Sequence, residues 1–254
     1  MGGQAGAIWA ERPAEPTSVA SLLGELRYGR ELARLLSSSV FRSVEQRETA
    51  PPVLLVPGFM AGDASLSVLR QWLMRRGHHV HMSGIRANVD CAEELVVRLD
   101  EQLQALASER EERVFLIGQS RGGVLARALA VREPDAVGGL AMLGSPVKDG
   151  LAVSTHVLRA ARVVATLGDL GVPGVLSHSC QDGACCADFR AQLAAPLPQH
   201  VQATAMYSYT DAIVDWRACV DPYAQPIAVD SSHCGMSVNV NVYKVLDRAL
   251  DEGS

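Results

Sequence analysis

Residues 118–122 read Gly118-Gln119-Ser120-Arg121-Gly122, a G-x-S-x-G motif. Before the motif, Val114-Phe115-Leu116-Ile117 is a short apolar run that predicts a buried strand, and after it residues 123–130 (GVLARALA) predict a helix. A serine on such a sharp strand-to-helix turn has a strained backbone, and its hydroxyl projects from the fold. We therefore expect Ser120 to be a nucleophile, on a turn without room for side chains at Gly118 and Gly122. The alternative is a glycine-rich turn whose serine only caps the helix.

Strands and helices alternate along much of the remaining chain. Short apolar runs predict strands, and longer runs with apolar residues at helical spacing predict helices. The expected strands are 53–56, 78–82, 114–117, 139–144, 204–208 and 226–229, and the expected helices are 65–76, 92–107, 123–130 and 240–250. This order predicts an α/β protein with a mostly parallel sheet of about six strands, flanked by helices on both faces.

The N-terminal part precedes this alternation. Residues 1–17 are small, charged and proline-containing, as in a loose tail, and residues 18–41 have apolar side chains at helical spacing. The pair Pro51-Pro52 ends this part. We therefore expect a tail and a helical leader over 1–52 and the α/β domain over 53–254.

Residues 146–198 interrupt the alternation. The segment is too long for a connection and too apolar for a linker, so we expect an insertion that forms a cap or lid over the functional face. A helix expected over 157–167 would give this cap an apolar side that can form a pocket. The alternative is one more crossover helix with long loops.

Composition limits the function and the compartment. The 254 residues are 48% apolar and 20% charged, which is typical of a soluble globular protein with a full core. The net charge of −5 argues against nucleic acid as a partner, because phosphate binding needs a basic face. No apolar run reaches the roughly 18 residues of a membrane span, and the start of the chain lacks the features of a secretory signal. We expect a cytoplasmic protein without stable membrane insertion, and the sequence carries no signal for its oligomeric state.

A serine nucleophile needs a base, and chain order selects the histidine. After a nucleophile on a strand-to-helix turn come an acid and then a histidine. Of the seven histidines, four follow the serine motif, and only His233 also follows the acids at the ends of the later strands. His233 stands in Ser231-Ser232-His233-Cys234-Gly235-Met236, directly after the last expected strand. We expect His233 to be the base.

The acid that orients the base follows the expected strand 204–208. Asp211 stands just past the carboxyl end of this strand, where α/β proteins collect their functional residues. Asp215 is the second candidate, one helical turn further on. Either aspartate could instead only cap a turn or a helix. We expect Asp211 to be the orienting acid.

An acyl-transfer site also needs donors for the oxyanion. One is the backbone N–H of the residue after the nucleophile, Arg121, and the other comes from the loop after the first strand. In that loop, Pro57-Gly58-Phe59-Met60-Ala61-Gly62, the N–H of Phe59 is our first choice and that of Met60 our second. The alternative is that this loop is a plain turn.

Six cysteines are present, at 91, 180, 185, 186, 219 and 234. The motif Cys180-x4-Cys185-Cys186, with His178 nearby, has some of the ligands of a zinc site. The spacing does not match a common zinc finger, and two adjacent cysteines rarely both bind one tetrahedral ion. We therefore expect neither a metal nor a cofactor, and reduced, half-buried thiols. A disulfide within Cys180–Cys186, or one between Cys219 and Cys234, is the alternative.

Together these motifs resemble the α/β-hydrolase superfamily, and more narrowly small bacterial lipases and esterases. The resemblance covers about residues 53–250 and rests on four segments: strand-Pro57-Gly58-Phe59, the G-x-S-x-G motif with its strand, residues 207–214 (YSYTDAIV), and residues 232–236 (SHCGM). It departs from the family in two places. The usual His-Gly is Pro57-Gly58 here, and the leader is expected to be helical where two further strands are common.

The resemblance implies a serine hydrolase that cleaves carboxylic esters through an acyl-enzyme on Ser120. Its substrate would be a small-molecule acyl ester, because an apolar insertion suits an acyl chain rather than a sugar or a phosphate. An acyltransferase or thioesterase of a biosynthetic pathway would use the same residues and another acceptor or leaving group. A binding protein without catalysis on the same fold is a third possibility, since one fold hosts many functions.

Overall fold

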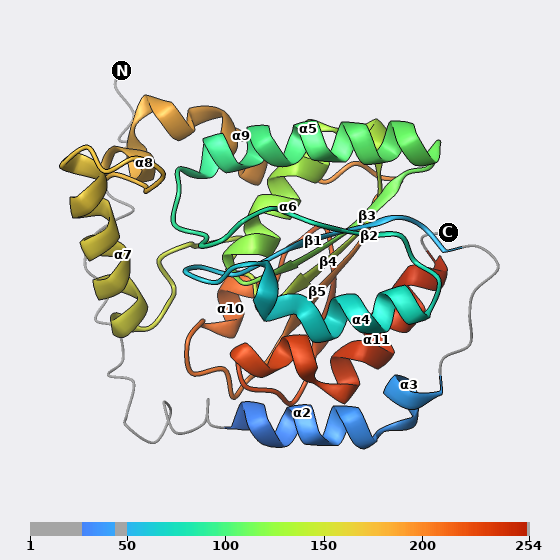
Figure 1. Ribbon diagram of the computed structural model, residues 1–254. Helices are drawn as coiled ribbons and strands as arrows, with labels where there is room; N and C mark the ends of the chain where they lie inside the picture. Colours follow the sequence, from blue (N-terminus) through green and yellow to red (C-terminus); the bar gives the residue numbers. More distant parts are fainter. Residues whose placement is uncertain (1–26, 44–49, 253–254) are drawn as a thin grey trace.

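The computed structural model describes residues 27–43 and 50–252 (Figure 1). Its centre is a six-stranded sheet with the order β2-β1-β3-β4-β5-β6, and each pair of neighbouring strands is parallel. The strands are β1 (Val53–Val56), β2 (Val80–Met82), β3 (Val114–Gln119), β4 (Val137–Leu143), β5 (Gln202–Tyr207) and β6 (Gln225–Ala228). The predicted parallel sheet of about six strands is confirmed.

Helices cover both faces of this sheet. In Figure 1, α5, α6 and α9 lie on one side of the strands, and α2, α4 and α11 lie on the other. The α-helices are α2 (Tyr28–Ser37), α3 (Ser39–Arg42), α4 (Ser67–Arg75), α5 (Ala92–Arg110), α6 (Arg121–Arg132), α7 (Thr155–Asp169), α8 (Ser179–Asp182), α9 (Ala187–Ala194), α10 (Trp216–Cys219) and α11 (Val240–Glu252). Four short 3-10 helices complete the described elements: η2 (Asp63–Leu66), η3 (Pro134–Ala136), η4 (Ala184–Cys186) and η5 (Cys234–Val238). Within the described ranges, no helix combines the length and the apolar character that a bilayer crossing requires.

The sheet separates two hydrophobic cores. Successive side chains of a strand point to opposite faces, so alternate residues of the buried strands enter different cores. Leu54 and Leu116 pack with side chains of α5 and α6, whereas Leu55 and Ile117 pack with side chains of α4 and α11. Every residue of β1 and β3 is buried, which explains why these strands are continuous apolar runs in the sequence.

The leader belongs to the second core. Leu35 of α2 and Phe41 of α3 are buried against side chains of α4 and α11. The indole N–H of Trp72 donates to the carbonyl of Val40 at 2.8 Å, and the Trp72 ring lies 4.8 Å from that of Tyr243. The expected tail, 1–17, and the first part of the expected leader helix, 18–26, lie outside the described residues.

The segment between β4 and β5 has two kinds of helix. Phe189 and Leu193 of α9 pack on the core beside α6, as the side chains of a crossover helix do. In Figure 1, α7 and α8 instead lie beyond the ends of the strands. The segment leaves β4 next to the loop after β5, where Val153 forms a bridge with Val214 and the Ser154 N–H donates to the Ile213 carbonyl at 2.7 Å. The cap expected over 146–198 remains a prediction.

Arg127 of α6 forms a buried ion pair with the loop before β6 and also binds the end of α9. The Arg127 guanidinium donates to the Asp221 carboxylate at 2.5 Å, and the two side chains are 3% and 1% exposed. The same guanidinium donates to the carbonyls of Gln192 and Ala195, at 3.0 and 2.9 Å. A buried charge is tolerated only with such partners.

We expect Arg127→Met to lower the free energy of unfolding by about 3–5 kcal/mol, because Asp221 would remain as a buried charge without its partner. Urea denaturation measures this loss. In the double variant Arg127→Met/Asp221→Asn, part of the stability should return. Arg217→Ala, which removes an exposed ion pair with Asp215, is the control and should change stability little. Equal losses in Arg127→Met and Arg217→Ala would contradict the role given to burial.

Candidate active site

Ser120 occupies a strained turn between β3 and α6. β3 ends at Gln119, α6 begins at Arg121, and Ser120 between them has φ 52° and ψ −124°. A positive φ is unfavourable for a residue with a side chain, and such strain persists only where the surroundings enforce it. The Ser120 N–H donates to the carbonyl of Leu143 at 2.7 Å, which ties the turn to the end of β4. This is the geometry expected of the G-x-S-x-G motif.

Close packing around the two motif glycines enforces the turn. A Cβ on Gly118 would overlap the backbone of Gly122, and a Cβ on Gly122 would overlap the carbonyl of Val56 at the end of β1. A Cβ on Gly58 would lie 3.2 Å from the Cβ of Ser120. The start of α6 thus sits against two neighbouring strands, and Ser120 lies next to the loop that follows β1.

Asp211 and His233 form a buried pair. Asp211 Oδ2 lies 2.7 Å from His233 Nδ1, and the side chains are 1% and 6% exposed. The other carboxylate oxygen, Oδ1, accepts from the backbone N–H groups of Ile213 and Val214, both at 2.8 Å. These bonds fix the carboxylate, so it can orient the imidazole and stabilise a positive charge on it.

Asp215 has a different role. Its carboxylate caps α10 by accepting from the backbone N–H of Arg217 at 3.0 Å, and its side chain is 44% exposed. The structure therefore brings Asp211, our first choice, to His233 and leaves Asp215, the second choice, as a helix cap.

Two contacts bring His233 to the Ser120 turn. The Gln119 side-chain amide donates to the carbonyl of His233 at 3.2 Å. Gly144 follows the Leu143 carbonyl that binds Ser120, and it has φ 58°. A Cβ on Gly144 would lie 3.2 Å from His233 Nδ1, so only glycine lets the imidazole approach the end of β4. Sequence reasoning missed both Gln119 and Gly144, although each stands directly beside a strand end.

In the loop after β1, hydrogen bonding distinguishes Phe59, the first choice of oxyanion donor, from Met60, the second choice. The Met60 N–H donates to the carbonyl of Asn88 at 3.1 Å, and Met60 has φ 59°. Asn88 also donates its side-chain amide to the Pro57 carbonyl at 2.7 Å and its backbone N–H to Ala61 at 2.9 Å. Because the Met60 N–H is engaged, Phe59 remains the better candidate.

The Arg121 side chain supports this loop through Asn88. Its guanidinium donates to the Asn88 side-chain oxygen at 2.5 Å and to the Asp90 carbonyl at 2.6 Å. Burial lowers the pKa of Arg121 to about 10, against the opposing effect of the Asp90 carboxylate. Arg121 therefore remains a cation at neutral pH. Sequence reasoning missed Asn88 and Asp90 because their role depends on contacts with Arg121, which lies 33 and 31 positions later in the chain.

The leader helix supports the loop that carries His233. The buried carboxylate of Glu31 in α2 accepts from the backbone N–H and from the hydroxyl of Ser232, both at 2.9 Å. Arg27 at the start of the helix forms an ion pair with Asp230 at 2.8 Å and donates to the Thr210 hydroxyl at 3.2 Å. Both loops of the Asp211–His233 pair are thus bound to one helix. A charged residue within the apolar pattern of the leader is the only sequence signal for this role.

Comparisons with known proteins support the fold. The chain matches no protein-family model and no curated protein sequence. Among solved structures, it is similar to the mature Bacillus licheniformis lipase BlEst2, with a TM-score of 0.60 and 15% identity over 81% of this chain and 94% of that one. The chain has the α/β-hydrolase fold.

Two further solved structures are similar to this chain. A monoglyceride lipase from Saccharomyces cerevisiae has a TM-score of 0.56 and 14% identity, over 83% of this chain and 90% of that one. A thioesterase domain from the curacin biosynthetic pathway has a TM-score of 0.50 and 12% identity, over 82% and 93%. These identities establish the shared fold, and the chemistry must be argued from the residues of this chain.

We expect Glu31→Ala to destabilise the protein and to loosen the His233 loop, because two buried donors of Ser232 would lose their acceptor, at about 1–3 kcal/mol for each unsatisfied group. Glu31→Gln keeps an acceptor and should retain more of the stability. Urea denaturation measures the first effect, and hydrogen exchange of residues 229–239 measures the second.

Ser37→Ala, at the exposed end of the same helix, is the matched control and should leave the exchange of residues 229–239 unchanged. If Glu31→Ala also leaves it unchanged, α2 does not position this loop.

Proposed function

We propose that the chain is a serine hydrolase that cleaves carboxylic esters through an acyl-enzyme on Ser120. His233 is the base, Asp211 the orienting acid, and the N–H groups of Phe59 and Arg121 the oxyanion donors. The observation that carries the proposal is the buried Asp211–His233 pair, at 2.7 Å, beside a serine held at a positive φ. A plain structural turn requires neither the strain nor the pair.

In this proposal His233 removes the proton of the Ser120 hydroxyl as its oxygen attacks the acyl carbon. Nδ1 of His233 is engaged by Asp211, so Nε2 accepts the proton and then donates it to the leaving alcohol as the ester C–O bond breaks. A water then attacks the acyl-enzyme and gives its proton to His233, which returns a proton to Ser120 Oγ as the acyl C–O bond breaks and the acid is released. Two backbone N–H groups stabilise the negative charge of each tetrahedral intermediate.

Apolar side chains near the pair support an acyl substrate. Tyr209 and Trp216 lie on the two sides of Asp211 in the chain, with ring centroids 4.9 Å apart. The Tyr207 ring stacks on that of Trp216, with ring centroids 5.5 Å apart. Tyr209 is exposed, and so is Met60 in the loop after β1. The expected cap segment, residues 146–198, contains the Val153 bridge to the loop of Asp211, so its helices can cover an acyl chain bound there.

A thioesterase or acyltransferase is the second candidate, because the acyl-enzyme and its three residues would be the same. The thioesterase domain among the similar structures favours the thioester form of this candidate. Rates with an ester and a thioester of the same acyl group distinguish the leaving groups, and added alcohol acceptors distinguish transfer from hydrolysis. A series of p-nitrophenyl esters of increasing acyl length then measures the pocket.

We expect Ser120→Ala to abolish turnover without unfolding the protein, because the alanine lacks the attacking oxygen. A fluorophosphonate should label the wild type at Ser120, as mass spectrometry of the peptides shows. Ser120→Gly should also be inactive but more stable than Ser120→Ala, because glycine adopts a φ of 52° without strain. Turnover by the alanine variant, or labelling of another residue, would refute the assignment.

We expect Asp211→Asn to lower kcat by about 10⁴, by analogy with the loss of the correct imidazole tautomer in other serine hydrolases. Asp215→Asn is the control, since Asp215 is a helix cap and its amide can still accept a hydrogen bond. Steady-state kinetics with one ester compares the two. A larger loss for Asp215→Asn than for Asp211→Asn would reverse the assignment.

A further inference from the structure

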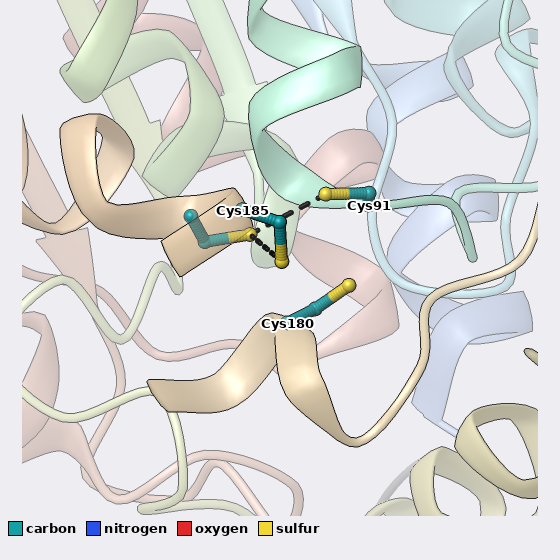
Figure 2. A group of neighbouring side chains, drawn as sticks. Cys91, Cys180 and Cys185 are labelled. Carbon is teal, nitrogen blue, oxygen red and sulfur yellow. Dashed lines mark hydrogen bonds between the residues drawn. The ribbon is translucent and has the colours of Figure 1, made fainter. Parts of the chain in front are cut away.

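Four cysteines converge outside the proposed active site. The sulfur atoms of Cys91, Cys180, Cys185 and Cys186 all lie within 4.8 Å of one another. Figure 2 shows three of these side chains pointing toward a common centre from different parts of the chain. Cys91 precedes α5, whereas the other three come from the segment of α8 and η4, about ninety residues later, with |i−j| of 95 between Cys91 and Cys186. All six cysteines of the chain are free thiols, so neither disulfide considered from the sequence is present.

The sulfur separations fit one tetrahedral ion. With zinc–sulfur bonds of about 2.3 Å, the sulfurs of a tetrahedral site lie about 3.8 Å apart. The Sγ atoms of Cys91 and Cys186 are 3.4 Å apart, and those of Cys185 and Cys186 are 3.9 Å apart. A disulfide needs about 2.05 Å, and these pairs are far from that distance.

The sequence-based objection to a shared ion does not apply to this backbone. Cys185 lies in η4, and Cys186 caps α9 with φ −115° and ψ 23°. This change of direction lets the two adjacent side chains reach the same cluster. His178, the other ligand considered from the sequence, instead pairs with Asp169 at 2.5 Å.

Helix N-termini, a backbone N–H and a guanidinium surround the sulfur atoms, although burial raises the pKa of the Cys91 thiol to about 12. Cys91 stands at the N-cap of α5 and Cys186 at the N-cap of α9, where helix N–H groups and dipoles favour negative charge. The Ser177 N–H donates to the sulfur of Cys180 at 3.4 Å. The Arg121 guanidinium also interacts electrostatically with Cys91, Cys180 and Cys186, which offsets part of the excess negative charge of four thiolates around one ion.

The segment that carries three of these cysteines has little core of its own. Between residues 166 and 196, Cys186 is the only buried residue. A segment with so few buried apolar side chains gains little stability from the hydrophobic effect, so it needs another stabilising interaction, such as a metal cross-link. One ion bound by residues of both segments would join α8 and α9 to the start of α5.

We propose that Cys91, Cys180, Cys185 and Cys186 form a structural zinc site. On binding, the four thiols release their protons to solvent and each sulfur donates an electron pair to the ion, with no change of oxidation state. The site would fix the chain at Cys91, next to Asn88 and Asp90, which bind Arg121 and the loop after β1. The zinc site is independent of the proposed ester hydrolysis.

The metal content of the purified full chain tests the proposal. The reduced protein, loaded with zinc and then dialysed, should contain about one zinc per chain, as one tetrahedral four-cysteine site requires. Inductively coupled plasma mass spectrometry measures this content. With cobalt in place of zinc, the protein should show the thiolate-to-cobalt charge-transfer and d–d absorption of a tetrahedral site.

Cys180→Ala and Cys185→Ala should lose the zinc and the cobalt spectrum, and neither side chain is fully buried, so folding should survive. Cys234→Ala is the matched control, because it removes an exposed cysteine outside the cluster and should retain the ion. Retention of zinc by all three variants would place the ion elsewhere and overturn the site. A disulfide in peptides alkylated without reduction, or four free thiols that bind no zinc, would overturn it too, and bound iron would overturn the choice of zinc.

Discussion

The approach of α6 to the ends of β1 and β3 leaves no space for side chains at Gly118 and Gly122. Since the start of the helix lies directly on two strands, the residue between β3 and α6 must turn within one step, and Ser120 takes a positive φ. The same contact places the loop after β1 beside the serine. The carbonyl at the end of β4 then receives the Ser120 N–H. The Ser120 side chain, the loop N–H groups and the Gly144 backbone owe their positions to this contact.

Polar contacts from distant parts of the chain complete the site. Asn88 binds both sides of the loop after β1 and is itself held by Arg121. Glu31 binds the loop of His233, and Arg27 of the same helix reaches the loop of Asp211 through Thr210. Each of these side chains is fixed by hydrogen bonds to backbone groups or to other polar side chains, which gives the loops defined positions without a large apolar contact.

The sheet could be predicted from the sequence because its central strands are buried on both faces and therefore appear as short apolar runs. The edge strand β2 was harder, since its residues are only partly covered and Val80–Met82 is shorter than the expected 78–82. Ser120, Asp211 and His233 could be selected because each follows a strand end in a fixed order. Asn88, Glu31 and the convergence of Cys91 with the later cysteines could not, because their partners lie between about thirty and two hundred positions away, with |i−j| of 33, 201 and 95. No local pattern encodes such contacts.

The short bridge between Val153 and Val214 has a consequence for recombining this protein with its structural neighbours. Loop exchange usually takes the ends of the flanking strands as joints. Here such a joint, placed at the end of β4, would also remove the partner of the segment that follows Asp211, because Ser154 and Ala152 bond to Ile213 and Asp215. A cap transplanted into this protein should therefore begin inside α7, after Thr155, so that the bridge between Val153 and Val214 and its flanking hydrogen bonds are kept.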